Sequence, residues 1–261
     1  WLDRGITVLS ETPAALDTDS LNKLYSYYKC GKKQVVAEQY REYPNIKASL
    51  KLINEGIIGD VSCVNVSLAH EYHGISLIRA FFGVNPGEKY TISAKTYEFP
   101  TTQTLTRYDK FTDGRIAGKK RCVATFEFES GKVAWYDFDS EQYRSPIRKN
   151  TLKVQGVRGE LIDDCVYYLD ENNDTGNSNP NFEKIREIKK ISFNNKIIYE
   201  PEFGLCGLSE DETAIAVMMK NTAEYSRGNA SAPYSMEDAL ADAYAAILLK
   251  KAVETGEVVH S

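Results

Sequence analysis

The chain has 261 residues, a formal net charge of −5, 42% hydrophobic residues and 26% charged residues, a composition typical of a globular protein with one large domain or two small ones. No basic run indicates nucleic-acid binding, and no apolar stretch approaches the roughly 20 residues of a membrane-spanning helix. Five widely spaced cysteines without a CxxC pair, and an opening that lacks a signal-peptide pattern, favour a reduced, cytoplasmic location without disulfides or a zinc site.

Strands and helices are predicted to alternate at the start of the chain. Residues 5–11 predict a short strand, and residues 17–32 predict a helix that an early Asp or Thr can cap and Gly31 can end. Residues 33–40 contain an unbroken apolar run, which is typical of a parallel strand buried on both faces. Strand, helix and strand at this spacing predict a βαβ unit.

A second alternation is predicted between residues 44 and 83. A helix runs from Pro44 to about Glu55, a strand covers 60–68, and another helix ends at Gly83. The apolar residues of the first helix, Ile46 among them, fall on one face. These elements continue the α/β character of the first part.

The region from about 88 to 200 is predicted to form an antiparallel sheet with one packed face and one more polar face. Ser130-Gly131 marks a hairpin turn between two of its strands. A polar segment, 170–181, predicts a loop; it begins like a calcium-binding loop but lacks the glutamate at position twelve. The predicted strands cover 89–99, 121–130, 132–140, 151–162 and 164–171.

Two helices are predicted at the end of the chain. Ser209 with Glu212, and Ser235 with Asp238, are capping-box patterns, and Gly228 and Gly256 are suited to ending the two helices. Together the elements predict an α/β piece joined to an α+β domain, whose mostly antiparallel, open sheet has helices packed on one face.

The stretch SLAHEYHGISLIRAFF, residues 67–82, places His70 and His73 at a strand-to-helix junction. Histidine suits acid–base chemistry, because its ordinary pKa lies near neutrality. A helix N-terminus disfavours an imidazolium, so we expect His73 to stay neutral, as a base must. Two other interpretations remain open: a metal pair completed by Glu71, or a plain cap or hydrogen-bond bridge.

Polar and aromatic residues elsewhere predict substrate contacts. Residues 39–41 follow the second predicted strand, at the carboxyl edge where open α/β sheets bind ligands. Arg41 either grips a carboxylate or sugar hydroxyls or forms a surface ion pair. Residues 137–148 have the composition of a site, although an edge loop has the same composition. The predicted substrate contacts are Tyr40, Arg41, Tyr72, Tyr143 and Arg144.

Five segments together carry a family resemblance that spans nearly the whole chain. They are GITVLSETP (5–13), VVAEQYREYPNIKASLKLINEGIIGDV (35–61), HGISLIRAFFG (73–83), VQGVRGEL (154–161) and YSMEDALADAYAAILLKKAVETGE (234–257). In this order they resemble the Gfo/Idh/MocA family of NAD(P)-dependent oxidoreductases. The resemblance implies that residues 1–40 are an α/β remnant, the C-terminal part of a dinucleotide-binding (Rossmann) domain. It implies that residues 41–261 are a substrate-binding and oligomerisation α+β domain, like the C-terminal domain of dihydrodipicolinate reductase.

The same resemblance implies hydride transfer between nicotinamide and a sugar, cyclitol or related polyol. The family's catalytic lysine, aspartate and histidine fall on Thr12, Ala69 and His73, so only the histidine matches. His70 is then a hypothetical stand-in for the aspartate. The departures leave open a redox-assisted lyase or glycosidase, or a non-catalytic member that senses a dinucleotide or sugar. The residues expected at the cofactor are Glu11, Thr12, Pro13 and Gln39.

The sequence contains no GxGxxG-like turn, the phosphate-binding feature of a dinucleotide-binding domain. We therefore expect this chain to be the C-terminal part of a longer enzyme, inactive alone and unable to retain the NAD or NADP that the full-length protein would bind. The expected partners are a small sugar-like substrate and further copies of the chain, in a homo-oligomer formed through the open face of the sheet. No metal, nucleic-acid or membrane partner is expected.

Overall fold

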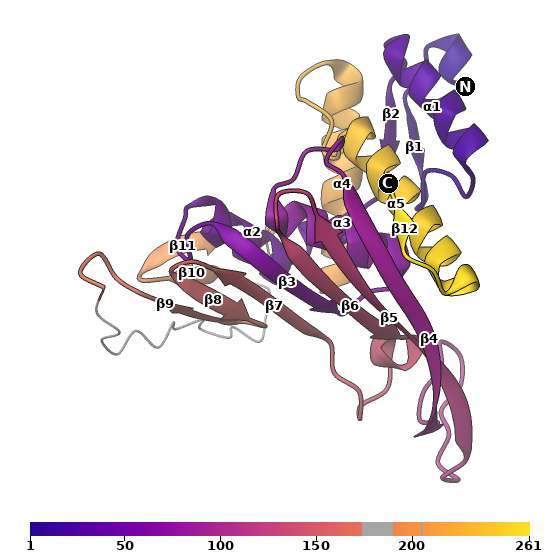
Figure 1. The fold of residues 1–261 in the computed structure, drawn as a ribbon. Coiled ribbons are helices and arrows are strands. Elements are labelled where there is room, and N and C mark those ends of the chain that lie inside the picture. Colours follow the sequence, from indigo (N-terminus) through magenta and orange to yellow (C-terminus); the bar gives the residue numbers. More distant parts are fainter. Residues whose placement is uncertain (174–189, 205) are drawn as a thin grey trace.

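Figure 1 shows the computed structural model of the chain, which describes residues 1–173, 190–204 and 206–261. A small parallel sheet lies near the N-terminus, and a separate eight-stranded, mostly antiparallel sheet forms the larger part of the molecule. The long helix α5, Met236–Thr255, packs against elements of both parts. The predicted combination of an α/β piece with a mostly antiparallel sheet is confirmed.

The N-terminal part is the predicted βαβ unit. Strands β1 (Val8–Ser10) and β2 (Gln34–Val36) pair in parallel, and helix α1 (Thr18–Lys29) connects them. Asp17 caps α1 by accepting the backbone N–H of Ser20 at 2.8 Å. The apolar run of β2 is fully buried, as expected for a parallel strand covered on both faces.

The large sheet has the strand order β12-β4-β5-β6-β3-β7-β8-β9. Strand β3 pairs in parallel with β6, and every other pairing in this sheet is antiparallel. The carboxyl ends of β3 and β6 therefore lie at the same edge. The strands are β3 (Val61–Ser67), β4 (Tyr90–Thr102), β5 (Ile116–Phe128), β6 (Val133–Asp139), β7 (Thr151–Gly156), β8 (Gly159–Ile162), β9 (Cys165–Tyr168) and β12 (Val259–His260).

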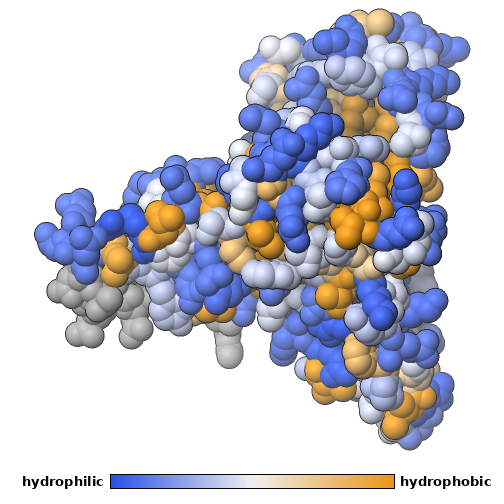
Figure 2. Space-filling view, viewed as in Figure 1, coloured by the Kyte–Doolittle hydropathy of each residue, from blue (hydrophilic) through white to orange (hydrophobic). Residues whose placement is uncertain are grey.

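Helices cover one face of this sheet and leave the other open, as predicted. On β5, Phe126 and Phe128 point into the core, whereas Val123 on the opposite face is 37% exposed. Helices α2 (Pro44–Asn54), α3 (Glu71–Phe82) and α5 supply the covering layer. The β4–β5 hairpin projects beyond the helices, and Figure 2 shows a mixture of hydrophilic and apolar side chains at its tip.

A close approach fixes the start of α3. A Cβ atom added to Gly74 would lie 2.6 Å from the ring of Tyr136, so only glycine lets the helix pack this close to β6. The Tyr136 hydroxyl accepts the backbone N–H of Glu71 at 2.7 Å and so satisfies one of the free donors of the first helical turn. The turn that carries both histidines is thus held by the sheet beneath it.

The closing helices begin and end as predicted. Ser209 and Glu212 form the capping box of α4 (Glu210–Arg227), and the Ser235 side chain accepts the backbone N–H of Asp238 at the start of α5. Glycines 228 and 256 end these helices in the left-handed conformation. Within the described ranges, each helix is too short or too polar to cross a lipid bilayer.

Several short elements differ from the prediction. Strands β10 (Ile191–Phe193) and β11 (Lys196–Tyr199) form an unpredicted antiparallel ribbon, and β12 adds an unpredicted edge to the sheet. Elements of two to four residues are too short to show a hydrophobic period, so the sequence pattern does not reveal them. The predicted loop over 170–181 lies mostly outside the described residues. The remaining short helices are η1 (Leu2–Arg4), η2 (Gln39–Glu42) and η3 (Ser140–Tyr143).

Candidate active site

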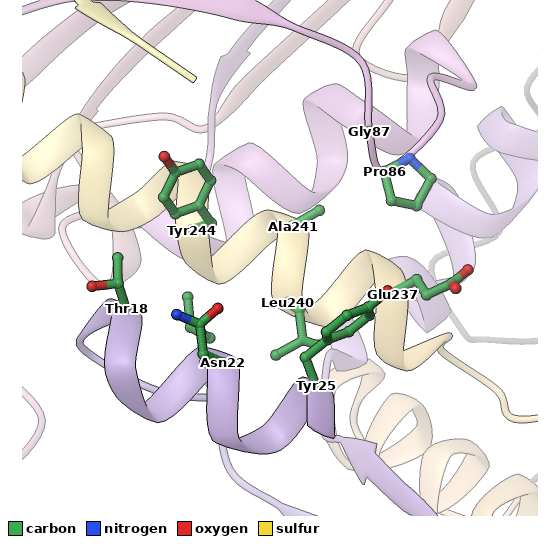
Figure 3. Close-up of a pocket in the computed structure, with 10 residues that line it drawn as sticks. Thr18, Asn22, Tyr25, Pro86, Gly87, Glu237, Leu240, Ala241 and Tyr244 are labelled. Carbon is green, nitrogen blue, oxygen red and sulfur yellow. The ribbon is translucent and has the colours of Figure 1, made fainter. Parts of the chain in front are cut away.

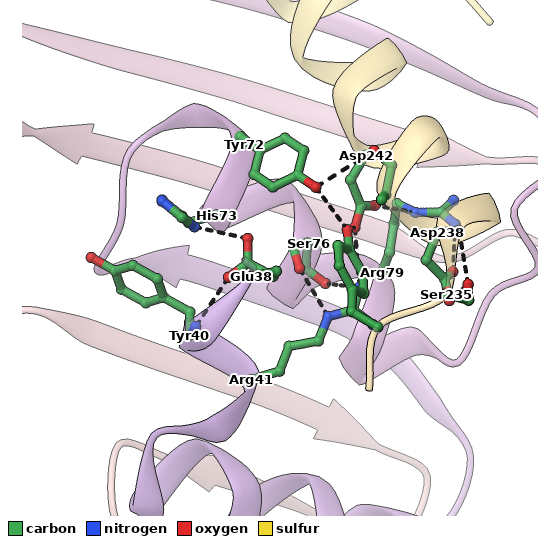
Figure 4. Close-up of polar contacts among 12 residues, drawn as sticks. Glu38, Tyr40, Arg41, Tyr72, His73, Ser76, Arg79, Ser235, Asp238 and Asp242 are labelled. Atoms are coloured by element: carbon green, nitrogen blue, oxygen red, sulfur yellow. Dashed lines mark hydrogen bonds and ion pairs between the residues drawn. The ribbon is translucent and has the colours of Figure 1, made fainter. Parts of the chain in front are cut away.

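His73 lies in the first turn of α3 and is only 4% exposed. Its Nδ1 lies 2.8 Å from Oε2 of Glu38, a buried carboxylate directly after β2 (Figure 4). A carboxylate can only accept, so Nδ1 carries the proton that is donated to it. The neutral His73 ring therefore keeps Nε2 as an unprotonated acceptor, the form that a general base requires.

The turn after β1 reaches the same nitrogen. The Thr12 hydroxyl lies 3.4 Å from Nε2 of His73, although 61 residues separate the two in sequence. Thr12 and Pro13 are half-buried and joined by a cis peptide bond, whereas Glu11 is exposed. The segment predicted to contact a cofactor and the predicted base therefore lie together.

His70 is the N-cap residue of α3, and its ring stands edge-on to that of His73 with 4.8 Å between centroids. The Tyr143 hydroxyl accepts the backbone N–H of His70 at 2.9 Å and makes a short contact with its Nδ1. Tyr40 packs 4.4 Å from the His73 ring, and its hydroxyl is hydrogen-bonded to that of Tyr143. Because β3 and β6 end at the same edge, the loops after them bring His70 and Tyr143 together.

These residues form one group, called here the histidine cluster. Burial, followed by the neighbouring His73, lowers the pKa of His70. Burial raises the pKa of both Tyr40 and Tyr143, so the two phenols stay protonated at neutral pH. The members are Thr12, Glu38, Tyr40, His70, His73 and Tyr143.

Glu38 corrects the sequence analysis on the partner of His73. The partner that holds the His73 ring is the carboxylate of Glu38, 35 positions upstream. It is not His70, and position 69 is occupied by a buried alanine. Glu38 could have been found as a charged residue placed directly after a buried apolar strand.

Arg41 and Tyr72 belong to a different, neighbouring group. Arg41 donates from Nε to the Ser76 hydroxyl at 2.8 Å and from Nη2 to Asp242 at 3.1 Å, so the ion-pair alternative describes its contacts (Figure 4). Tyr72 is 3% exposed, and its hydroxyl lies 3.1 Å from that of Tyr234. Their predicted role as substrate contacts is not supported by these positions, because their polar atoms already meet protein partners.

This second group, called here the arginine network, ties three elements together. Asp242 of α5 is completely buried, and burial raises its pKa although Arg41 and Arg79 oppose the rise. Arg79 on α3 contacts both Asp238 and Asp242. The network consists of Arg41, Tyr72, Ser76, Arg79, Tyr234, Asp238 and Asp242. It fixes η2, and with it Glu38 and Tyr40, against α3.

The remaining predicted residues lie at the margin of the histidine cluster. Gln39 is half-buried at the start of η2, between Glu38 and Tyr40. Arg144 is exposed directly after η3. Gln142, which belongs to the site-like segment 137–148, donates from Nε2 to the backbone oxygens of Ser67 at 2.9 Å and Lys149 at 3.0 Å, and so fixes the loop that carries Tyr143.

Two hollows in the surface lie apart from the histidine cluster. One, of about 720 Å³, lies between α1 and α5, and Tyr25, Leu240 and Tyr244 are among its lining residues (Figure 3). The other, of about 820 Å³, lies on the open face of the sheet between Tyr97 and Trp135. In the part of the chain that the structure describes, no three His, Cys, Asp or Glu side chains gather as ligands for a metal ion.

No protein-family model and no curated protein matches the sequence. Solved structures do match. An oxidoreductase from Agrobacterium radiobacter, in complex with NAD+, L-tartaric acid and magnesium, is 11% identical with a TM-score of 0.67 over 99% of this chain and 74% of its own. Levoglucosan dehydrogenase with NADH and levoglucosan is 15% identical with a TM-score of 0.65, covering 99% and 74%. Scyllo-inositol dehydrogenase from Lactobacillus casei is 16% identical with a TM-score of 0.62, covering 99% and 73%. At these identities the likeness shows the fold, so this chain has the fold of the matching part of these oxidoreductases.

Proposed function

We propose that the chain forms the substrate-binding and proton-transferring part of an NAD(P)-dependent oxidoreductase that acts on a sugar, cyclitol or related polyol. The observation that carries the proposal is the meeting of Thr12, Glu38 and His73 from three separate elements, with Nε2 of His73 as an acceptor that the Thr12 hydroxyl reaches at 3.4 Å. The fold of this chain, which is that of several sugar and inositol dehydrogenases, supports the same class of reaction.

The chain's own contribution is to accept a proton. A nicotinamide cofactor, when bound, supplies the acceptor for the hydride that leaves the carbinol carbon, so the hydroxyl proton is left for the protein. Nε2 of His73 takes that proton, and the Glu38 carboxylate at Nδ1 stabilises the imidazolium that forms. In the reverse direction the imidazolium returns the proton to the carbonyl oxygen.

The residues present fit one end of such a cofactor. At the carboxyl end of β1 the Ser10 hydroxyl is buried without a hydrogen-bond partner among the described residues, and Thr12 follows two positions later. These groups would face the nicotinamide, together with the predicted Glu11, Pro13 and Gln39. The start of α1 does not fit the pyrophosphate, because Asp17 caps it and Asp19 adds a second acidic residue to its first turn. The groups that hold the phosphates are therefore not supplied by α1.

We also propose the division of the chain at about residue 40 and a homo-oligomer formed through the open face of the sheet. Exposed Tyr97, Phe99 and Trp135 on β4 and β6 support the second proposal, since exposed aromatic residues are enriched at protein interfaces. Sedimentation of the wild-type chain beside a Trp135→Ser variant tests it, because a monomeric wild type would contradict an oligomer at this face.

The function is tested by assaying the full-length protein for NAD(P) reduction with a panel of sugars and cyclitols. For the substrate that emerges, His73→Gln should lower kcat by about 10²- to 10⁴-fold, because it removes the general base. His260→Gln, which changes an exposed histidine of β12, is the matched control and should leave kcat unchanged. A His73→Gln variant with wild-type kcat would refute the proposal.

A non-catalytic role as a dinucleotide or sugar sensor is the second candidate, and Thr12 and Ala69 favour it because neither supplies a charge. Cofactor binding without reduction of NAD(P) by any member of the panel would support this candidate. Release of a leaving group from the substrate without net NAD(P) reduction would instead indicate a redox-assisted lyase or glycosidase.

A further inference from the structure

The Tyr143 hydroxyl has three hydrogen-bonding neighbours. Its oxygen accepts the backbone N–H of His70 at 2.9 Å, and the hydroxyls of Tyr143 and Tyr40 are hydrogen-bonded to each other. The same hydroxyl is in short contact with Nδ1 of His70.

A proton donated by Tyr143 to Nδ1 of His70 would leave the proton of the neutral His70 ring on Nε2. The neighbouring His73 has the opposite arrangement, since its Nδ1–H donates to Glu38 and its Nε2 accepts. The two rings, whose centroids are 4.8 Å apart, would then present one donor nitrogen and one acceptor nitrogen.

We propose that Tyr143 is a positioning residue, which holds His70 as an Nε2–H donor for a second substrate oxygen beside the hydroxyl that His73 deprotonates. The inference rests on the proposed function and narrows its substrate class. The donor–acceptor pair suits two neighbouring oxygens, as in a vicinal diol, where one hydroxyl gives up its proton and the next accepts a hydrogen bond. Tyr143 then acts through His70, because its own hydroxyl already contacts His70 and Tyr40.

The electrostatic surroundings suit an uncharged donor. Burial and the nearby His73 lower the pKa of His70, which keeps its ring neutral at pH 7. Glu38 is the carboxylate closest to the two rings, and the guanidinium of Arg41 is already paired with Asp242. The pair is therefore better suited to neutral oxygens than to a carboxylate of the substrate.

A Tyr143→Phe variant of the full-length protein tests the inference by kinetics. The substitution keeps the ring, which packs 4.9 Å from Phe138, and removes only the hydroxyl. The probes are myo-inositol, scyllo-inositol and their monodeoxy counterparts, which lack one neighbouring hydroxyl. Wild type should prefer the intact diol by about 10²-fold or more in kcat/KM, since a site built to bind a hydroxyl rejects an analogue without it. Tyr143→Phe should lose most of that preference, and Tyr97→Phe, on the open sheet face, should keep it.

Nitrogen-15 NMR of the histidine rings gives a second readout, which needs no substrate. In the wild-type chain His70 should titrate with its neutral proton on Nε2. In Tyr143→Phe the pKa of His70 should rise, because the donor that stabilises the neutral ring at Nδ1 is lost. A purely structural role for Tyr143 would change neither the ring protonation nor the preference for the diol.

The outcomes separate this inference from the function on which it rests. If the wild-type protein fails to reduce NAD(P) with every polyol tested, the proposed function is refuted, and the proposed role of His70 is refuted with it. If wild type oxidises the inositols but does not distinguish them from the monodeoxy compounds, only the present inference is overturned. A wild-type His70 that carries its proton on Nδ1 would overturn it as well.

Discussion

The histidine cluster and the arginine network share helix α3 and the short helix η2, yet they differ in how far their polar groups are paired with protein partners. In the arginine network Asp242 lies against two arginines and a tyrosine, and all of these groups meet protein partners. In the histidine cluster each ring has one nitrogen engaged by the protein, at Glu38 or Tyr143. The second nitrogens remain for Thr12 or a ligand.

This difference indicates what each group contributes. A buried pair whose charges compensate one another mainly resists disruption, because the loss of one partner leaves an uncompensated charge in the core. A pair of titratable rings, each with a second nitrogen open to Thr12 or a ligand, can move protons near neutral pH. We therefore assign stability to the arginine network and chemistry to the histidine cluster, and each substitution below should affect one group far more than the other.

The largest expected effect is that of Asp242→Asn on folding. The substitution leaves Arg41 and Arg79 without their shared buried carboxylate, and it should lower the free energy of unfolding by roughly 3–5 kcal/mol. Urea unfolding followed by circular dichroism measures the change. Glu254→Gln, which breaks the exposed pair with Lys250, is the matched control and should cost under about 1 kcal/mol. Equal effects of the two substitutions would remove the basis for treating the arginine network as the stabilising group.

Glu38→Gln should act mainly on the reaction. Without the carboxylate at Nδ1, His73 loses the partner that fixes its tautomer and stabilises its imidazolium. We expect kcat of the full-length protein to fall about 10²-fold, which corresponds to about 2.7 kcal/mol of activation free energy. The melting temperature should change far less than in Asp242→Asn. A kcat within twofold of wild type would mean that His73 needs no orienting partner.

The sequence predicted the parts of the fold that local patterns specify. The βαβ unit, the start of α2 at Pro44 and the capping box of α4 each depend on residues close together in the chain. The arginine network was not predicted, because Arg41 and Asp242 are 201 positions apart and only the packing of α5 brings them together. The same reason explains why the partner of His73 was sought within its own loop and not at the end of β2.

The candidate site was predicted in outline but not in its contacts. Placing His73 near Thr12 depended on resemblance to a family, since no periodicity relates two residues 61 positions apart. Tyr143 was predicted from the composition of its segment, whereas its contact with His70 follows from the parallel pairing of β3 with β6. A strand order cannot be deduced from the apolar pattern of each strand taken alone.

The smallest expected effect is on stability as a function of pH, and there the two groups should respond in opposite directions. The folded pKa of His70 lies below its ordinary value of 6.5, so its contribution to stability is complete above about pH 6.5 and is lost as the pH falls through the folded pKa. Asp242 has a raised pKa, so the pH-dependent part of its contribution is complete below its ordinary value of 3.8 and is lost as the pH rises through its folded pKa. The free energies of unfolding of wild type and of His70→Asn, measured between pH 5 and 8, test the direction expected for His70. The residues around the ring, His73, Glu38, Tyr40 and Tyr143, are the same in both proteins. The variant should show a flatter decline below pH 6.5 than wild type. If its decline is equally steep, the lost stability comes from another group, and the low pKa of His70 does not distinguish the histidine cluster from the arginine network.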